Sequence, residues 1–131
     1  MPRRHIEGTW QKQRAFSPAV VTEGGTTIWL AGHGATHDDA GASLAGDFDA
    51  QVRQSFKNIE RSLAAAGGRL TDIVTMTVYI VDVRHGDRFI ELRKQHFPDG
   101  NYPASALITV TGFARPEMLV EIMPIAVVGD R

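Results

Sequence analysis

The segment IVTMTVYIV, residues 73–81, alternates two sets of side chains that are both compatible with burial. The first set is wholly apolar and consists of Val74, Met76, Val78 and Ile80. The second set contains threonines, a tyrosine and a valine. Because successive side chains of a strand point to opposite faces, the segment predicts a β-strand that is covered on both sides.

An amphipathic helix is predicted before this strand. From Phe48 to Ala66 the apolar residues recur at steps of three and four, which places them in one stripe along a helix. Asp47 is a typical N-terminal cap, and Gly67-Gly68 is a typical helix end. A second, shorter helix is predicted over residues 87–97, where a proline follows.

Further strands are predicted on both sides of these helices. Residues 26–31, TTIWLA, lie between glycines, and residues 104–111 and 118–128 are rich in β-branched side chains. An earlier strand is predicted near residues 11–14. We therefore expect an α+β fold with two helices on one face of a mixed sheet. We find no repeat or linker and expect a single domain over residues 1–131.

The predicted strands carry more apolar side chains than two helices can cover. These are Leu107, Leu119, Met123, Ile125 and Val127. An exposed apolar patch of this size favours association, and a closed homo-oligomer buries it symmetrically.

The composition excludes several classes of function. Fourteen Lys and Arg against fifteen Asp and Glu give a net charge of −1, and no basic run exceeds Arg3-Arg4, so we expect no nucleic-acid partner. The absence of cysteine excludes thiol catalysis, disulfides and cysteine-ligated zinc. No segment has the apolar length of a membrane span, and no export signal is found, so we expect a cytoplasmic protein with no membrane partner.

Glu121 is the residue most out of place in the predicted strand 118–128. Alternation places its carboxylate in a row of apolar side chains. A carboxylate held in such a setting can act as a general acid or base. The alternative is a structural ion pair at an interface.

His33 directly follows a predicted strand, in Ala31-Gly32-His33-Gly34. The glycines allow a ligand to approach the backbone closely, and histidine exchanges protons near neutral pH. Alternatively, its ring is satisfied by backbone or solvent.

His33 and His37, with the two aspartates that follow, have metal-ligand side chains. Their spacing aligns two histidines only on a helix, whereas a loop is predicted, so we expect no metal site.

The order of several short segments resembles that of the Rid family (YjgF, reactive intermediate deaminase), over about residues 12–128. The segments are Phe16-Ser17-Pro18-Ala19-Val20, Leu30-Ala31-Gly32-His33, Asp47-Phe48-Asp49-Ala50-Gln51, Ala65-Ala66-Gly67-Gly68, Val78-Tyr79, Phe97-Pro98, Tyr102-Pro103-Ala104-Ser105, Ala114-Arg115-Pro116-Glu117 and Leu119-Val120-Glu121-Ile122. The resemblance implies a chorismate-mutase-like fold with a mixed six-stranded sheet and two helices on one face. It also implies a homotrimer with small-molecule sites between subunits.

The resemblance further implies hydrolysis of imines or enamines to a carbonyl compound and ammonia, without metal or organic cofactor. Carried over by position, Glu121 orients water, Phe16 lines the cleft, and Ala31-Gly32-His33 forms a strand-end loop at the substrate. The substrate-binding arginine of the family falls on Ser105 here. A hydroxyl cannot replace a bidentate guanidinium, and its loss weakens carboxylate binding by about 2 to 5 kcal/mol.

Three interpretations follow from this departure. The first is a hydrolase of a neutral or differently charged C–N compound, with Glu121 positioning water and with His33 and Ser105 contacting substrate. The second is a non-catalytic trimer that binds a metabolite or acts as a chaperone-like or regulatory module. The third is imino-acid deamination in which Arg14 or Arg115 supplies the missing guanidinium.

Overall fold

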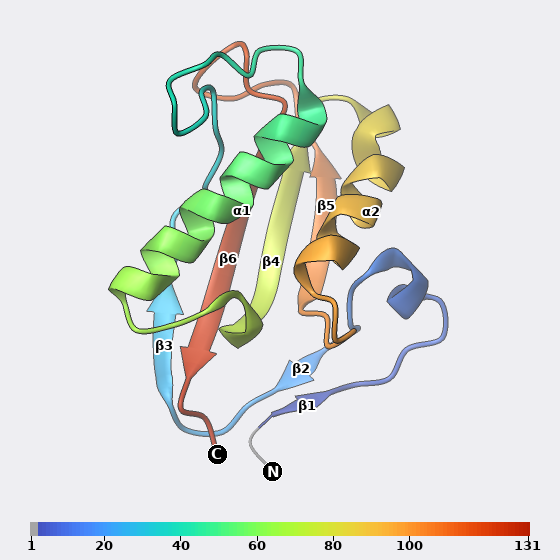
Figure 1. Cartoon of the computed structure of the whole chain (residues 1–131). Coiled ribbons are helices and arrows are strands. Elements are labelled where there is room, and N and C mark those ends of the chain that lie inside the picture. Colours follow the sequence, from blue (N-terminus) through green and yellow to red (C-terminus); the bar gives the residue numbers. More distant parts are fainter. Residues whose placement is uncertain (1–2) are drawn as a thin grey trace.

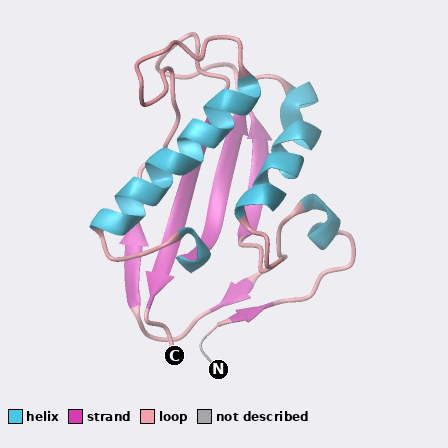
Figure 2. Ribbon diagram, in the orientation of Figure 1, coloured by secondary structure: helices cyan, strands magenta, loops and turns pink. Residues whose placement is uncertain are grey.

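The protein is described here by a computed structural model that covers residues 3–131 (Figure 1). Its main sheet has four strands in the order β3-β6-β4-β5. The strands are β3 (Thr26–Trp29), β4 (Ile73–Ile80), β5 (Ala104–Thr109) and β6 (Val120–Val128). β4 and β5 run parallel and the other neighbours antiparallel, so the sheet is mixed. Helices α1 (Phe48–Ala65) and α2 (Gly86–His96) cover one face (Figures 1 and 2), which confirms the α+β class.

Helix α1 begins and ends where the sequence predicts. The Asp47 carboxylate accepts a hydrogen bond of 3.0 Å from the backbone N–H of Ala50. At the other end Gly67 has a φ of +85°, and the N–H of Gly68 donates to the carbonyl of Leu63 at 2.7 Å. A left-handed glycine of this kind satisfies carbonyls that the last helical turn leaves free.

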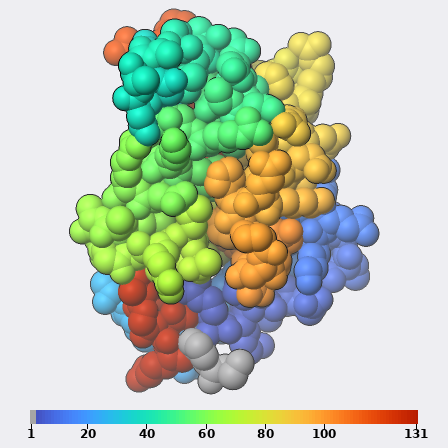
Figure 3. All heavy atoms as spheres, in the orientation of Figure 1, coloured from blue at the N-terminus to red at the C-terminus, as the bar shows by residue number. Residues whose placement is uncertain are grey.

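The core lies between the sheet and the two helices. On β4 the side chains that face the helices are almost fully buried, and they pack against apolar residues of α1 and α2. The buried set includes Met76, Val78, Ile80, Val52, Phe56, Ile59, Phe89 and Leu92. Figure 3 shows that side chains of α1 and α2 close over this side of the molecule. Within residues 3–131 neither helix has the length and apolarity needed to cross a membrane.

The six strands do not form one sheet, which corrects the expected six-stranded arrangement. β1 (Arg4–His5) and β2 (Val20–Val21) pair with each other in a separate two-stranded sheet. β4 lies between β5 and β6, so the last two strands are not neighbours. Pairing between strands depends on contacts far apart in the chain, which the local pattern does not encode.

The predicted strand near residues 11–14 was wrong. These residues form a 3₁₀ helix, η1 (Gln11–Arg14), which ends at Ala15 with a φ of 59°. The segment QKQR has no β-branched residue, and its backbone bonds are satisfied locally. Two further 3₁₀ turns, η2 (Leu70–Asp72) and η3 (Val83–His85), precede β4 and α2.

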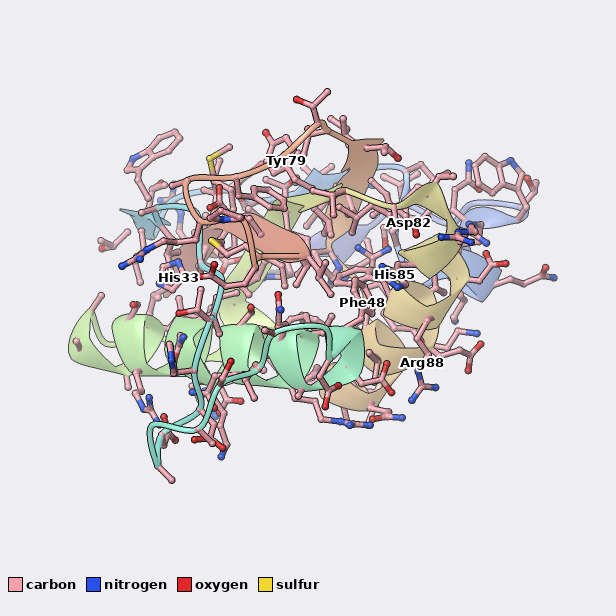
Figure 4. All side chains as sticks on the ribbon, turned by 90° about the horizontal axis from the view of Figure 1, so that it is seen from above. His33, Phe48, Tyr79, Asp82, His85 and Arg88 are labelled. Carbon is pink, nitrogen blue, oxygen red and sulfur yellow. The ribbon has the colours of Figure 1, made fainter. Side chains whose placement is uncertain are left out.

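The sheet face away from the helices is open in a single chain. We call it the open face, and its side chains include Trp29, Tyr79, Ile108, Glu121, Met123 and Ile125. Trp29 is 77% exposed, Ile108 43% and Met123 40%. Figure 4 shows Tyr79 on the side of the sheet opposite α1. An apolar surplus on this face was expected.

Two of the residues expected in this surplus lie elsewhere, and a third, Val127, is on the face of Ile125 but is buried. Leu107 is paired with Val78 in the β4–β5 ladder and therefore faces the helices. Leu119 precedes β6 and packs against the core. Leu119 lies outside the strand, and the sequence alone does not show which face of β5 meets the helices, since the pairing with β4 sets the facing of Leu107.

Candidate functional site

A cavity of about 270 Å³ lies where α2, β5 and the N-terminal segment meet. Its lining consists of Trp10, Arg14, Phe16, Ile90, Arg93, Ser105 and Leu107. Three of these residues, Arg14, Phe16 and Ser105, were predicted as site residues. Segments that are about 90 residues apart in the chain thus meet at one hollow.

Backbone hydrogen bonds fix the N-terminal segment against the start of β5. The N–H of Ser17 donates to the carbonyl of Pro103 at 3.0 Å, and its hydroxyl donates to the carbonyl of Tyr102 at 2.7 Å. Phe16 is thereby held beside the cavity. The Trp10 ring packs edge-on against it, with ring centroids 5.6 Å apart. The two rings provide an apolar wall on this side of the cavity.

Arg93, which the sequence analysis did not single out, lies at the Ser105 end of the cavity. Its side chain comes from α2, is 1% exposed, and donates to the Ser105 hydroxyl at 2.7 Å and to the Arg14 carbonyl at 3.0 Å. The guanidinium carbon lies 5.1 Å from the centre of the Phe89 ring. Burial, and secondarily the charge of Arg14, lowers the pKa of Arg93 to about 10. It remains a cation at neutral pH.

The two arginines proposed to replace the missing guanidinium differ in position. Arg14 lines the cavity, but its guanidinium forms a surface ion pair of 3.0 Å with Asp87. Arg115 is exposed in the connection between β5 and β6 and does not line the cavity. Only these two arginines were expected as replacements, whereas the arginine that contacts Ser105 is Arg93.

Glu121 lies on the open face, at the start of β6, and is half-buried. Its carboxylate rests on the backbone of Gly32, so that a Cβ built at position 32 would lie 2.5 Å from Oε2 of Glu121. Gly32 and the exposed Ala31 belong to the segment that continues β3 along the edge of β6. The absence of a side chain at Gly32 is what admits the carboxylate.

His33 points the other way. Its backbone pairs with Ile122 at 2.7 and 2.8 Å, and its ring lies on the side of α1 (Figure 4). Nδ1 is 2.7 Å from the Ala31 carbonyl and Nε2 is 2.8 Å from the Ser62 hydroxyl. Both ring nitrogens therefore have partners within the chain, and His33 does not face Glu121.

Within one chain the predicted residues form two separate groups. Ser105 is in register with Met76 and faces the helices, whereas Glu121 is in register with Tyr79 and lies on the open face. Three residues along β4 and two strand spacings separate them, about 14 Å between backbones. A single chain does not bring Glu121 to the cavity.

The histidines and aspartates near residue 37 do not converge on a point. His37 Nδ1 is 3.0 Å from the Thr36 hydroxyl, and Asp39 is paired with Arg61 and Lys57. The bond from Arg61 holds the pKa of Asp39 below its ordinary value. In residues 3–131 no three His, Asp or Glu side chains gather in a way that could hold a metal ion.

A signal for Arg93 was present in the sequence. Phe89, Ile90 and Phe97 form the apolar stripe of α2, and Arg93 is four residues from both phenylalanines. A charged residue in an apolar helical stripe is as unusual as the carboxylate at position 121. The remaining lining residues, Trp10, Ile90 and Leu107, have no distinguishing local pattern.

The α+β fold of this chain places it in the class of Rid proteins, since a solved Rid structure superimposes on nearly the whole chain. The chain matches the family model described as Endoribonuclease L-PSP over residues 10–128. It therefore belongs to that family, which is the YjgF/Rid family.

Individual relatives support the assignment. The 2-iminobutanoate/2-iminopropanoate deaminase of Rattus norvegicus is 31% identical over 88% of this chain and 81% of its own length. The human protein of the same name is 29% identical over 87% and 80%. The structure of YyfB, a Rid family protein of unknown function from Yersinia pestis, superimposes with a TM-score of 0.85 at 26% identity, covering 98% of this chain and 100% of that one.

Proposed function

We propose that this protein is a Rid-type hydrolase that converts a small imine or enamine to a carbonyl compound and ammonia. The reaction would occur in a cleft between subunits of a homotrimer in the cytoplasm, without metal or organic cofactor. Relatives named as deaminases of 2-iminobutanoate and 2-iminopropanoate support this chemistry.

One observation carries the proposal. The cavity that holds Phe16, Ser105 and Arg93 lies on the helix side of the sheet, and Glu121 lies on the open face, about 14 Å away. The open face also exposes apolar side chains such as Trp29. Packing the open face of one subunit against a second subunit buries that surface and gives Glu121 a neighbour's cavity as its partner.

The chemistry assigned to Glu121 is general base catalysis. A water hydrogen-bonded to its carboxylate attacks the imine carbon, so a C–O bond forms while the carboxylate accepts a proton. The C=N π electrons pass to nitrogen, which takes the proton from the carboxyl group and leaves a carbinolamine. The carbinolamine hydroxyl then gives its proton, through the carboxylate, to the nitrogen, so that the C–N bond breaks as C=O forms and the products are a carbonyl compound and ammonia. The missing side chain at Gly32 leaves room for the Glu121 carboxylate, because a Cβ at position 32 would overlap the carboxylate.

A small-molecule substrate fits this site better than RNA. The chain has a net charge of −1 and no basic run longer than two residues. Binding of a polynucleotide depends on many contacts from cations to phosphates. The cavity is walled mainly by aromatic and aliphatic side chains.

The test is ammonia release from imines made in situ by an amino-acid oxidase, with and without the protein. We expect the protein to accelerate imine loss and Glu121→Gln to reduce the acceleration at least 100-fold, at the scale of a lost general base. Glu60→Gln, on the exposed side of α1, is the matched control. Undiminished turnover in Glu121→Gln would remove Glu121 from the mechanism. The assembled mass, measured by ultracentrifugation, should be that of a trimer for both variants.

A further inference from the structure

The cavity beside β5 contains a positive charge that no acid among the described residues, 3–131, neutralises. Arg93 is almost fully buried, and within residues 3–131 no aspartate or glutamate forms an ion pair with it. The two acids of the same helix, Asp87 and Glu91, pair with Arg14 and Lys94. A buried charge without a counter-ion is costly, so its retention indicates an anion that is not part of the chain.

The guanidinium retains donors for such an anion. It has five N–H groups, and two of its nitrogens each make one hydrogen bond, to Ser105 and to the Arg14 carbonyl. The third nitrogen, Nε, is buried and has no partner in the described residues. A planar group with free donors is suited to the two oxygens of a carboxylate.

The rest of the cavity defines the body of the ligand. Trp10, Phe16, Ile90 and Leu107 supply aromatic and aliphatic walls, and the volume is about 270 Å³. This is near the lower end of small-molecule sites. A ligand that fills it has an apolar group of modest size attached to its charged end.

We propose that Arg93 binds the carboxylate of a small organic acid whose apolar body packs against Trp10 and Phe16. Arg93 thereby supplies, from helix α2, the cationic fork that a serine at position 105 cannot supply from β5. Identifying this acid with the imine substrate or its keto-acid product rests on the proposed function, whereas the binding itself does not. Ser105 positions the guanidinium by accepting its hydrogen bond.

The test compares two probes of the same shape, phenylacetate and the neutral phenylacetamide, by titration calorimetry on the full chain. We expect phenylacetate to bind the wild type at least tenfold more tightly than phenylacetamide. Arg93→Met should remove this preference, since it keeps the length and apolar stem of the side chain but not the charge. Arg88→Met, which removes an exposed arginine of the same helix (Figure 4), should leave it unchanged.

If Arg93 has only a structural role, the binding results should differ from those expected for an anion site. Arg93→Met lowers the melting temperature in either case, because the hydrogen bonds to Ser105 and to the Arg14 carbonyl are lost. If Arg93 is purely structural, however, the variant keeps the affinity of the wild type for phenylacetate. If Arg93→Met does not fold, Arg93→Lys, which keeps the charge without the planar fork, should weaken phenylacetate binding at least threefold. Equal affinity of the wild type for the two probes, no phenylacetate binding at 10 mM, or unchanged binding in the Arg93 variant would each overturn the proposal.

The outcome is separable from that of the proposed function. Carboxylate binding without imine hydrolysis would refute the hydrolase and retain the role of Arg93. If Arg93→Met leaves imine hydrolysis unchanged, the hydrolase is retained and the role of Arg93 is refuted.

Discussion

The carboxylate of Glu121 and the backbone of Gly32 are packed so closely that a Cβ at position 32 would lie 2.5 Å from Oε2. Gly32→Ala should therefore displace the carboxylate without straining the backbone. We expect imine hydrolysis to fall about 10- to 100-fold, because small displacements of a catalytic group have effects of this size. Gly112→Ala, where an added Cβ meets nothing within 4 Å, is the control. Equal rates for the two variants would show that the position of Glu121 is not limiting.

Restoring an arginine at position 105 should be harmful in this chain. Ser105→Arg would place a second guanidinium beside Arg93, whose hydrogen bond to Ser105 is 2.7 Å long. We expect a lower melting temperature, and recovery in the double variant Arg93→Ser with Ser105→Arg. Chemical denaturation of the four proteins should give a coupling energy of about 1 to 3 kcal/mol. Additive effects would mean that the two positions do not share one space.

Gln51 connects two loops to α1 and should be important for stability. Its buried side chain donates to the carbonyls of Leu44 and Glu117, at 3.0 and 2.9 Å, and accepts from the N–H of Leu119 at 2.8 Å. Gln51→Leu leaves these backbone groups without partners, and we expect a loss of about 3 kcal/mol in the free energy of unfolding. Gln54→Leu, which loses bonds only to other side chains, should cost less than half as much.

The contribution of the Arg3–Asp130 ion pair to stability should decrease at acidic pH. Arg3 donates to both Asp130 oxygens at 3.0 and 3.1 Å, and this contact holds the pKa of Asp130 below its ordinary value of 3.8. A lowered carboxyl pKa stabilises the fold above the ordinary value and ceases to do so as the pH falls through the lowered one. Asp130→Asn should thus melt below the wild type at pH 7, and the difference should shrink below pH 4. Glu23→Gln, an exposed change, should show no such convergence.

Assembly should depend on the open face. Trp29 is 77% exposed there, and Trp29→Glu introduces a charge that an apolar interface would have to bury. We expect the mass in solution to fall to that of the monomer in light scattering at micromolar concentration. Val83 is 71% exposed in the 3₁₀ turn before α2 and is not part of the open face, so Val83→Glu should leave the assembly intact. An unchanged mass for Trp29→Glu would exclude the open face as the interface.

Sequence reasoning succeeded where the determinants are local. The Asp47 cap, the apolar spacing and the glycine pair together locate α1 to within one residue. It failed where the outcome depends on distant partners. The sequence of residues 104–109 does not indicate that β5 pairs with β4 and not with β6. It also does not indicate that β1 and β2 form a separate sheet.

The candidate site follows the same division. Phe16, Ser105 and Glu121 could be located from the order of segments, but their distribution over two faces of the sheet could not. His33 illustrates the limit, because the sequence shows flanking glycines and the structure shows a ring held by Ser62. Arg93 stands out in the apolar stripe of α2, but its contact with Ser105 is known only from the packing of α2 against β5.

In the nine-residue strand β6, successive side chains point alternately to the core and to the open face. Ile122 is fully buried against the helices, while its neighbour Glu121 reaches the other side. Sliding the strand by one position would bury the carboxylate and expose the isoleucine. This segment therefore tolerates exchanges of similar residues but no insertion or deletion of a single residue, so β6 should keep a constant length as related sequences diverge.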